Sequence, residues 1–262
     1  MGRIGTIESV YRYPVKSMRG ETPAQIFLSF SGVYGDRLYA FRSPTAPVGF
    51  PYHTGREHED LLLYQPRYRY SGTLVPPNLT EAEALAPGIT PVFGERNQFA
   101  LDVTTPDGTV LPIESPELTA DMQKAREDEA PVTLTFSQVA MTDCRPISLI
   151  SLQTVDTLQN ELGATLDKRR FRANLYADFK EAGGLVEKDY VGKTIKIGDK
   201  AVVSFLERDP RCKMICLDPD TADHNPKLLQ VLAEKHEGRA GIYAAILVEG
   251  VVKAGDDIVV VE

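Results

Sequence analysis

The sequence of 262 residues has few cysteines and no long apolar run. Cys144, Cys212 and Cys216 are too few, and odd in number, for a disulfide scaffold, so we expect a reducing, cytoplasmic compartment. They are also too few to supply all the ligands of an iron–sulfur cluster. No stretch is apolar over the length that a membrane-spanning helix or the core of a secretory signal requires. We therefore expect neither membrane association nor secretion.

Positive charge is in deficit as well. Lys and Arg number 29 against 37 Asp and Glu, which gives a net charge of −8 and a pI near 5.2. Because such a chain repels polyanions, it is not expected to bind nucleic acid. Apolar residues are 42% and charged residues 25% of the chain. These fractions are typical of a globular protein with a sizeable core.

The spacing of apolar residues predicts a mainly β fold with a few helices, an α+β class. Short apolar segments at 4–11, 26–28 and 38–41 are each ended by turn residues, and 99–111 is typical of a hairpin around Pro106-Asp107-Gly108. Residues 43–58 are rich in proline and glycine, which favours a surface loop. Helices are predicted to open at Ser115, Ser151 and Asn225, each followed by apolar residues at helical spacing. The helix after Ser151 is predicted to end just before Gly163.

Cys212 is the strongest candidate for chemistry. It follows the apolar run 202–206 and lies between Arg211 and Lys213, whose charges would favour a thiolate that attacks electrophiles or binds soft metals. The alternative is a small buried residue without function, which is how we interpret Cys216 and Cys144. A zinc site is not favoured, since the cysteines and histidines do not form two closely spaced ligand pairs.

Basic residues gather at several places in this acidic chain. Four of the five residues at 168–172 are cationic, Lys16 lies beside Ser17 on a predicted turn, and Arg37 follows Gly35 and Asp36. Each group alone is typical of a solvated surface. Together they indicate a site for one small anion such as a phosphate, to which the helix after Ser151 would add its free N–H groups.

These features resemble the MOSC-domain proteins, named for the C-terminal domain of molybdenum cofactor sulfurase. The resemblance covers nearly the whole chain in the family's order. It rests on YPVKS at 13–17, GDR at 35–37, TGR at 54–56, RPISLIS at 145–151, FRAN at 171–174, RC at 211–212, DPDT at 218–221 and VVKAGD at 251–256.

The resemblance implies a fold, a cofactor and a set of binding residues. The fold would be a MOSC β-barrel at 111–262 preceded by a smaller N-terminal β-barrel lobe at 1–110. The cofactor would be the molybdenum cofactor, a pyranopterin that carries molybdenum and a phosphate. Cys212 would be the catalytic metal ligand. The residues around the pterin and phosphate would be Lys16, Ser17, Arg37, Thr54, Arg56, Ser151, Arg172, Asn174 and Arg211.

This chain departs from the family at three places. Many members carry a second cysteine where this chain has Asp209, and threonines where it has Ile215 and Cys216. Cys144 replaces a residue that is commonly less reactive. We expect these changes to alter substrate range and redox tuning more than cofactor binding.

The resemblance also implies an activity. It favours an oxidoreductase that reduces N-hydroxylated or N-oxygenated small molecules with electrons from a separate flavin, haem or ferredoxin-type protein. An alternative is a sulfur-transfer or cofactor-carrier module with a persulfide on Cys212, and another is a non-catalytic binding scaffold. These residues show no pyridoxal-phosphate domain, so we do not expect a complete cofactor sulfurase.

Overall fold

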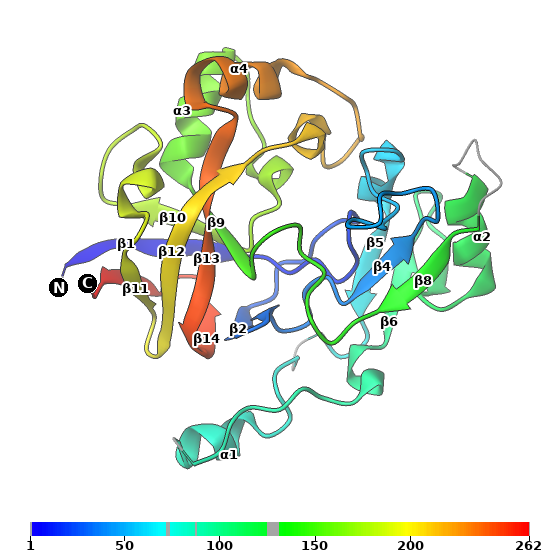
Figure 1. Cartoon of the computed structure of the whole chain (residues 1–262), viewed down its shortest axis with the longest axis horizontal. Coiled ribbons are helices and arrows are strands. Elements are labelled where there is room, and N and C mark those ends of the chain that lie inside the picture. Colours follow the sequence, from blue (N-terminus) through cyan, green and yellow to red (C-terminus); the bar gives the residue numbers. More distant parts are fainter. Residues whose placement is uncertain (1, 72–73, 87, 125–130, 262) are drawn as a thin grey trace.

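The computed structural model describes residues 2–71, 74–86, 88–124 and 131–261 (Figure 1). Its strands are β1 (Arg3–Val10), β2 (Gln25–Ser29), β3 (Gly32–Val33), β4 (Tyr39–Arg42), β5 (Gln65–Tyr68), β6 (Leu101–Thr104), β7 (Val110–Pro112), β8 (Thr133–Phe136), β9 (Ile147–Ser151), β10 (Leu175–Phe179), β11 (Thr194–Ile197), β12 (Ala201–Pro210), β13 (Arg239–Val248), β14 (Gly250–Lys253) and β15 (Asp257–Val260). The α-helices are α1 (Leu79–Ala84), α2 (Pro116–Lys124), α3 (Leu152–Leu162) and α4 (Lys227–His236). The 3₁₀ helices are η1 (Glu59–Leu63), η3 (Arg96–Phe99), η4 (Lys168–Phe171), η5 (Val186–Tyr190) and η6 (Lys213–Cys216). The prediction of a mainly β fold with a few helices is confirmed.

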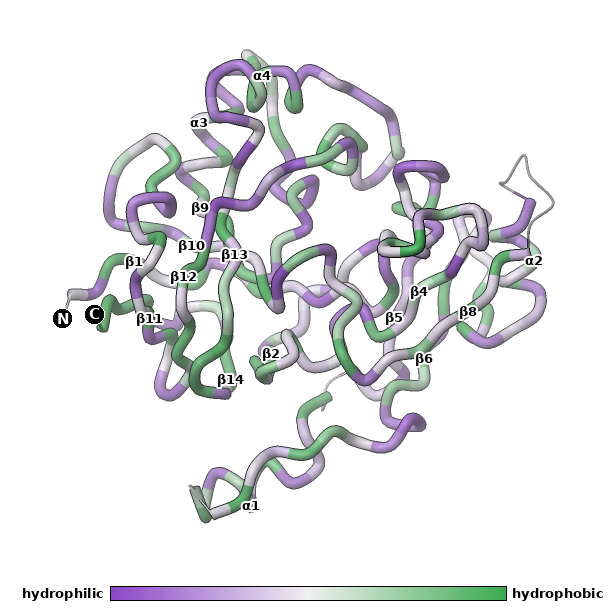
Figure 2. The backbone as a smooth tube through the Cα atoms, in the orientation of Figure 1, coloured by the Kyte–Doolittle hydropathy of each residue, from purple (hydrophilic) through white to green (hydrophobic). Residues whose placement is uncertain are grey.

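A closed barrel forms the larger part of the molecule, in the order β1-β10-β9-β13-β12-β11-β15 (Figure 1). Neighbouring strands are antiparallel except β9 and β10, which are parallel. Along β12, Ala201, Val203 and Phe205 alternate with less buried residues and point into the core. Figure 2 shows hydrophobic stretches along β12 and β13. This alternation of two residues is what a strand with one buried face requires.

The parallel pair is joined by α3, which covers one end of the barrel. Ser151 ends β9 and caps α3, because its hydroxyl accepts a hydrogen bond from Thr154 N. The helix ends at Gly163 in the left-handed conformation (φ 65°), as predicted from the sequence. The predicted helix after Asn225 is α4, which packs on α3 around Leu158, Leu228 and Leu232. These helices form a second core above the barrel.

A smaller lobe lies beside the barrel and contains the predicted hairpin. β6 and β7 pair around a turn in which Gly108 has φ 88°, and β5 completes their sheet. A second sheet pairs β4 with β8. In the described residues these sheets are open and enclose an aromatic core that includes Tyr39, Phe41 and Phe99, rather than closing into a smaller barrel.

The strands do not divide at residue 110, where the sequence predicted a domain boundary. β1 pairs with β10 and β15 and so belongs to the larger barrel. In the opposite direction, β8 lies after residue 110 but pairs with β4 of the smaller lobe. Both pairings join segments more than ninety residues apart in the chain, so local sequence patterns do not reveal them. As a domain boundary, the division stays a prediction.

No helix in the described residues is long and apolar enough to cross a membrane.

Candidate functional site

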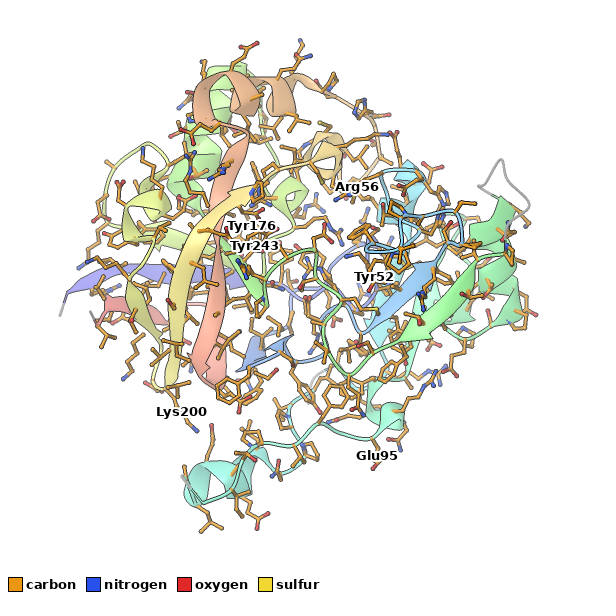
Figure 3. All side chains as sticks on the ribbon, viewed as in Figure 1. Tyr52, Arg56, Glu95, Tyr176, Lys200 and Tyr243 are labelled. Carbon is orange, nitrogen blue, oxygen red and sulfur yellow. The ribbon has the colours of Figure 1, made fainter. Side chains whose placement is uncertain are left out.

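A cavity opens where the barrel meets the loop that follows β4. Figure 3 shows Arg56, from that loop, and Tyr243, from β13 of the barrel; both line the cavity. The same cavity contains nearly all of the site residues expected from the sequence. They are Lys16, Ser17, Arg37, Thr54, Arg56, Arg172, Asn174, Arg211 and Cys212.

Ser151 is the exception, and the structure places it outside the cavity lining. Its side chain is fully buried, and its hydroxyl donates to Glu187 Oε2 at 2.5 Å while it caps α3. Glu187 also accepts hydrogen bonds from Thr154 and from the backbone N–H of Gly241. The hydrogen-bonding groups of Ser151 at the start of α3 are therefore satisfied by Thr154 and the buried Glu187. The prediction that Ser151 lies in the binding site is wrong.

Three cavity residues adopt the left-handed backbone conformation, which is unfavourable for residues with a side chain. Ser17 has φ 67°, Arg37 has φ 48° and Arg172 has φ 52°. Such strain costs about 1–3 kcal/mol per residue and persists where the surrounding structure enforces it. Here Arg37 N donates to Tyr13 O at 2.6 Å, and the Arg37 guanidinium donates to Arg172 O at 3.1 Å. The strained backbone holds three polar side chains at one place, which is typical of a functional site.

Tyr13 is a supporting residue that the sequence did not single out. The guanidinium carbons of Arg37 and Arg172 lie 4.6 and 4.5 Å from the centre of its ring. Its hydroxyl donates to Ala173 O, and burial raises its pKa to about 12. Gly20 packs against this ring so closely that a Cβ atom there would lie 2.5 Å from a ring carbon. A neutral tyrosine thus orients two arginines toward the cavity without neutralising them.

Most of the arginines that line the cavity have a carboxylate of their own. Arg37 pairs with Asp36, Arg145 with Glu207, Arg170 with Asp218 and Arg211 with Asp209. In each pair the guanidinium nitrogen lies within 4 Å of a carboxylate oxygen, so the two opposite charges offset each other. They leave a different group of cations to interact with a ligand.

Lys16, Arg56 and Arg172 form that group, which we call the cation cluster. Lys16 and Arg56 share one carboxylate, Asp143. Arg172 has no carboxylate within 4 Å among the described residues, and burial together with the nearby Arg37 lowers its pKa to about 10. Three cations against one carboxylate leave an excess of two positive charges. The sequence suggested a small-anion site, and this arrangement supports it.

Asp143 was not among the predicted residues. It accepts a hydrogen bond from Lys16 Nζ, and Arg56 Nη2 lies 3.4 Å from its other oxygen. Burial raises the pKa of Asp143, but the neighbouring cations outweigh this effect, so the pKa lies below its usual value. Its proximity to Lys16 joins segments 127 residues apart and had no signal in the sequence.

Cys212 is partly exposed two residues after the end of β12 and is the N-cap residue of η6. The cation beside its sulfur is Arg56, whose Nη2 is 3.6 Å from Sγ. The prediction that Arg211 and Lys213 flank the thiol was wrong about the geometry. Arg211 donates to the carbonyls of Phe171 and Ala240. Lys213 donates to Arg56 O at 3.0 Å and pairs with Glu59.

The loop that carries Arg56 is fastened to the segment that carries Cys212. A Cβ atom at Gly55 would lie 2.9 Å from Met214 Sδ, so the absence of a side chain lets Met214 pack closely. Lys213 adds its hydrogen bond to the Arg56 carbonyl. Thr54 closes the loop from within, because its N–H and hydroxyl both donate to Glu57. Thr54 thus shapes the loop that positions Arg56.

Residues 137–259 match the family model described as "MOSC domain". The chain contains a MOSC domain. No curated protein matches. Among solved structures, the YuaD protein of Bacillus subtilis is 14% identical, with 97% of this chain and 93% of that chain covered and a TM-score of 0.47. YiiM of Geobacillus stearothermophilus is 19% identical, with 45% and 55% covered and a TM-score of 0.36. YiiM of Escherichia coli is 17% identical, with 45% and 55% covered and a TM-score of 0.33.

The MOSC domain supplies only part of the cavity. Arg172, Asn174, Arg211 and Cys212 lie within the matched residues. Those that precede the match are Lys16, Ser17, Arg37, Thr54 and Arg56. Two members of the cation cluster therefore come from outside the MOSC domain, so the domain alone would lack the cation nearest to Cys212.

Asp209 is a second carboxyl group that lines the cavity, and it belongs to the MOSC domain. Its side chain is buried, pairs with Arg211 Nη1 at 2.9 Å and is hydrogen-bonded to Tyr243. Burial raises its pKa to about 6, although Arg211 and Tyr243 lower it. The resemblance to the MOSC-domain proteins implies that many relatives carry a cysteine at this position.

Of the remaining basic residues, few reach the cavity. In the run 168–172, Lys168 pairs with Glu8, and Arg169 pairs with Asp167 and Asp220. Arg170 and Arg172 line the cavity. The run is thus divided between surface ion pairs and the site. Cys216 is buried, and burial raises the pKa of its thiol, whereas Cys144 is exposed.

Proposed function

We propose that this cavity binds the molybdenum cofactor, with its phosphate on the cation cluster and the Cys212 thiolate on the metal. The observation that carries the proposal is the presence, in one cavity, of a partly exposed thiol and an excess of two positive charges. A phosphate monoester carries close to two negative charges at neutral pH, so its charge matches that excess. A thiolate is a ligand that soft transition metals prefer.

The donors in the cavity support the fit. Arg172 Nη2 and Arg211 Nη2 are buried and have no hydrogen-bond acceptor among the described residues. An unmet buried donor is costly, and an anionic ligand would supply the missing acceptors. Asn174 joins Tyr11 O and Ser148 N by hydrogen bonds of 3.4 Å, so it fixes the backbone at the base of the cavity.

The bound cofactor would supply electron-pair transfer to the substrate. Reduction of an N-hydroxylated compound cleaves the N–O bond, consumes a pair of electrons and a pair of protons, and releases water. The electrons would come from a separate flavin, haem or ferredoxin-type protein. Arg56 would lie beside the metal-bound sulfur of Cys212, and the apolar part of the wall against which a small substrate packs would be Phe50, Met214 and Ile215.

The experiment is to purify the protein from molybdenum-replete cells and to measure molybdenum and pterin content. We expect bound cofactor in the wild type, loss of the metal in Cys212→Ser, and unchanged content in Cys216→Ser. The second variant is the matched control because Cys216 is buried and does not line the cavity. Absence of metal and pterin, with no uptake of added cofactor, would contradict the proposal.

Activity is tested separately with an N-hydroxylated amidine and a chemical electron donor. Turnover that depends on Cys212 supports an oxidoreductase. Tight cofactor binding without turnover on any N-oxygenated compound would instead favour a binding scaffold or carrier.

Sulfur transfer is a second candidate because Cys212 is partly exposed beside a cation. The Cys212 thiolate would attack the outer sulfur of a sulfane-sulfur donor such as a cysteine persulfide, the donor's inner sulfur would leave as a thiolate, and Cys212 would gain the mass of one sulfur atom. Mass spectrometry that finds no such addition would exclude this candidate.

A further inference from the structure

Asp143 occupies an unusual position at the rim of the cavity. Its side chain is 46% exposed, yet it is the carboxylate that Lys16 and Arg56 share. Lys16 itself is almost completely buried, at 4% exposure. A buried ammonium is thus paired with a carboxylate that reaches it from solvent.

The contacts of Lys16 show that Asp143 does not occupy all of its hydrogen-bonding capacity. Lys16 Nζ donates to Met141 O at 2.8 Å and to Asp143. The ammonium group has three N–H donors, and one of them has no acceptor in the part of the chain that the structure describes, so it is available to a ligand. The rings of Phe50 and Tyr52 flank it at 4.8 and 4.9 Å. Asp143 therefore reduces the charge of the site without closing it.

We propose that Asp143 determines which anions the cavity accepts, as an internal counter-ion that sets the excess charge of the cation cluster. This inference rests on the proposed function in that it concerns the same phosphate site. With Asp143 in place, the excess matches a phosphate monoester. Without it, the excess rises by one charge and favours an anion of higher charge, such as a diphosphate.

The test uses the protein without cofactor and measures binding of inorganic phosphate and inorganic pyrophosphate by calorimetry at one pH and ionic strength. Asp143→Asn is compared with Asp102→Asn. Asp102 is the matched control because it is also a partly exposed aspartate that pairs with an arginine, Arg69, and neither residue lines the cavity.

We expect Asp143→Asn to shift the ratio of the two dissociation constants toward pyrophosphate by about three- to fivefold, since the charge lies at a partly solvated rim. Asp102→Asn should change the ratio less than twofold. An unchanged ratio in Asp143→Asn, or equal weakening of both anions, would overturn the inference and make Asp143 a positioning residue for Lys16.

A wild-type measurement keeps the inference falsifiable if the variant does not fold. Wild-type protein that binds pyrophosphate more than tenfold tighter than phosphate overturns it. Binding of neither anion overturns both this inference and the phosphate site of the proposed function. A protein that binds phosphate with the expected ratios but never contains molybdenum contradicts the cofactor proposal alone.

Discussion

The guanidinium Nη2 of Arg56 lies 3.6 Å from the sulfur of Cys212, although the two residues are 156 positions apart. The charged atoms of Arg211 and Lys213, the neighbours of Cys212 in the chain, bond elsewhere. Arg56 comes from outside the MOSC domain, so the loop of the smaller lobe completes the surroundings of a thiol on the barrel. This relationship can be tested directly.

Replacing Arg56 should slow the reaction of the thiol. Arg56→Met removes the guanidinium beside the sulfur, and we expect alkylation of Cys212 by the anionic reagent iodoacetate to slow by about three- to tenfold, because the cation attracts that reagent. Lys213→Met should have a smaller effect because its ammonium group bonds to Glu59 and the Arg56 carbonyl. Alkylation rates followed by mass spectrometry distinguish the two, and a larger effect from Lys213→Met would contradict the geometry.

Gly241 is predicted to be essential for the position of Arg211. A Cβ atom there would lie 2.8 Å from both Arg211 Nη2 and Leu149 O, and its φ is 75°. Gly238 has a similar φ of 71°, but a Cβ atom built on Gly238 would have no described atom within 4 Å.

Gly238→Ala should therefore cost about 1–2 kcal/mol of unfolding free energy from backbone strain alone. Gly241→Ala should cost about 1–3 kcal/mol more because of the clash. Denaturant unfolding of the two variants measures the difference, and equal costs would show that the backbone near Leu149 yields easily.

Asp209 should make the stability depend on pH. Its pKa is raised to about 6 in the folded protein, so between its ordinary value and 6 the folded state holds a proton that the unfolded chain has lost. Its contribution is therefore fully present at low pH and is lost as pH rises through that range.

The loss should be on the order of 3 kcal/mol. We expect the unfolding free energy of the wild type, relative to Asp209→Asn, to fall by this amount between about pH 4 and pH 6.5. A difference that is independent of pH would show that Arg211 keeps Asp209 ionised.

Ser151 should affect stability and not anion binding. Ser151→Ala removes the cap of α3 and one hydrogen bond to the buried Glu187, at a cost of about 1–2 kcal/mol. Its affinity for phosphate should equal that of the wild type, whereas Ser17→Ala should weaken phosphate binding, since Ser17 lines the cavity. Calorimetry and thermal unfolding on both variants test the assignment, and a weaker phosphate affinity in Ser151→Ala would contradict it.

The sequence by itself determined the components of the molecule. Alternating apolar residues such as Val203 and Phe205 fixed a mainly β fold, and Ser151 and Gly163 marked both ends of α3, because these signals act within a few residues. The thiol of Cys212 and the arginines of the site were also visible as residue types in recognisable motifs. The residue types present in a segment, and the spacing of its apolar residues, do not depend on the rest of the chain.

Only the tertiary structure decided which charges remain for a ligand. Arg169 is bound by Asp167 and Asp220, whereas Arg172, a few positions along, has no carboxylate within 4 Å among the described residues. Asp143 and Arg56 meet Lys16 and Cys212 from distant segments. Electrostatic interactions fall off with distance in space and not along the chain, so pairing, and with it the free charge of the cavity, is set by the fold.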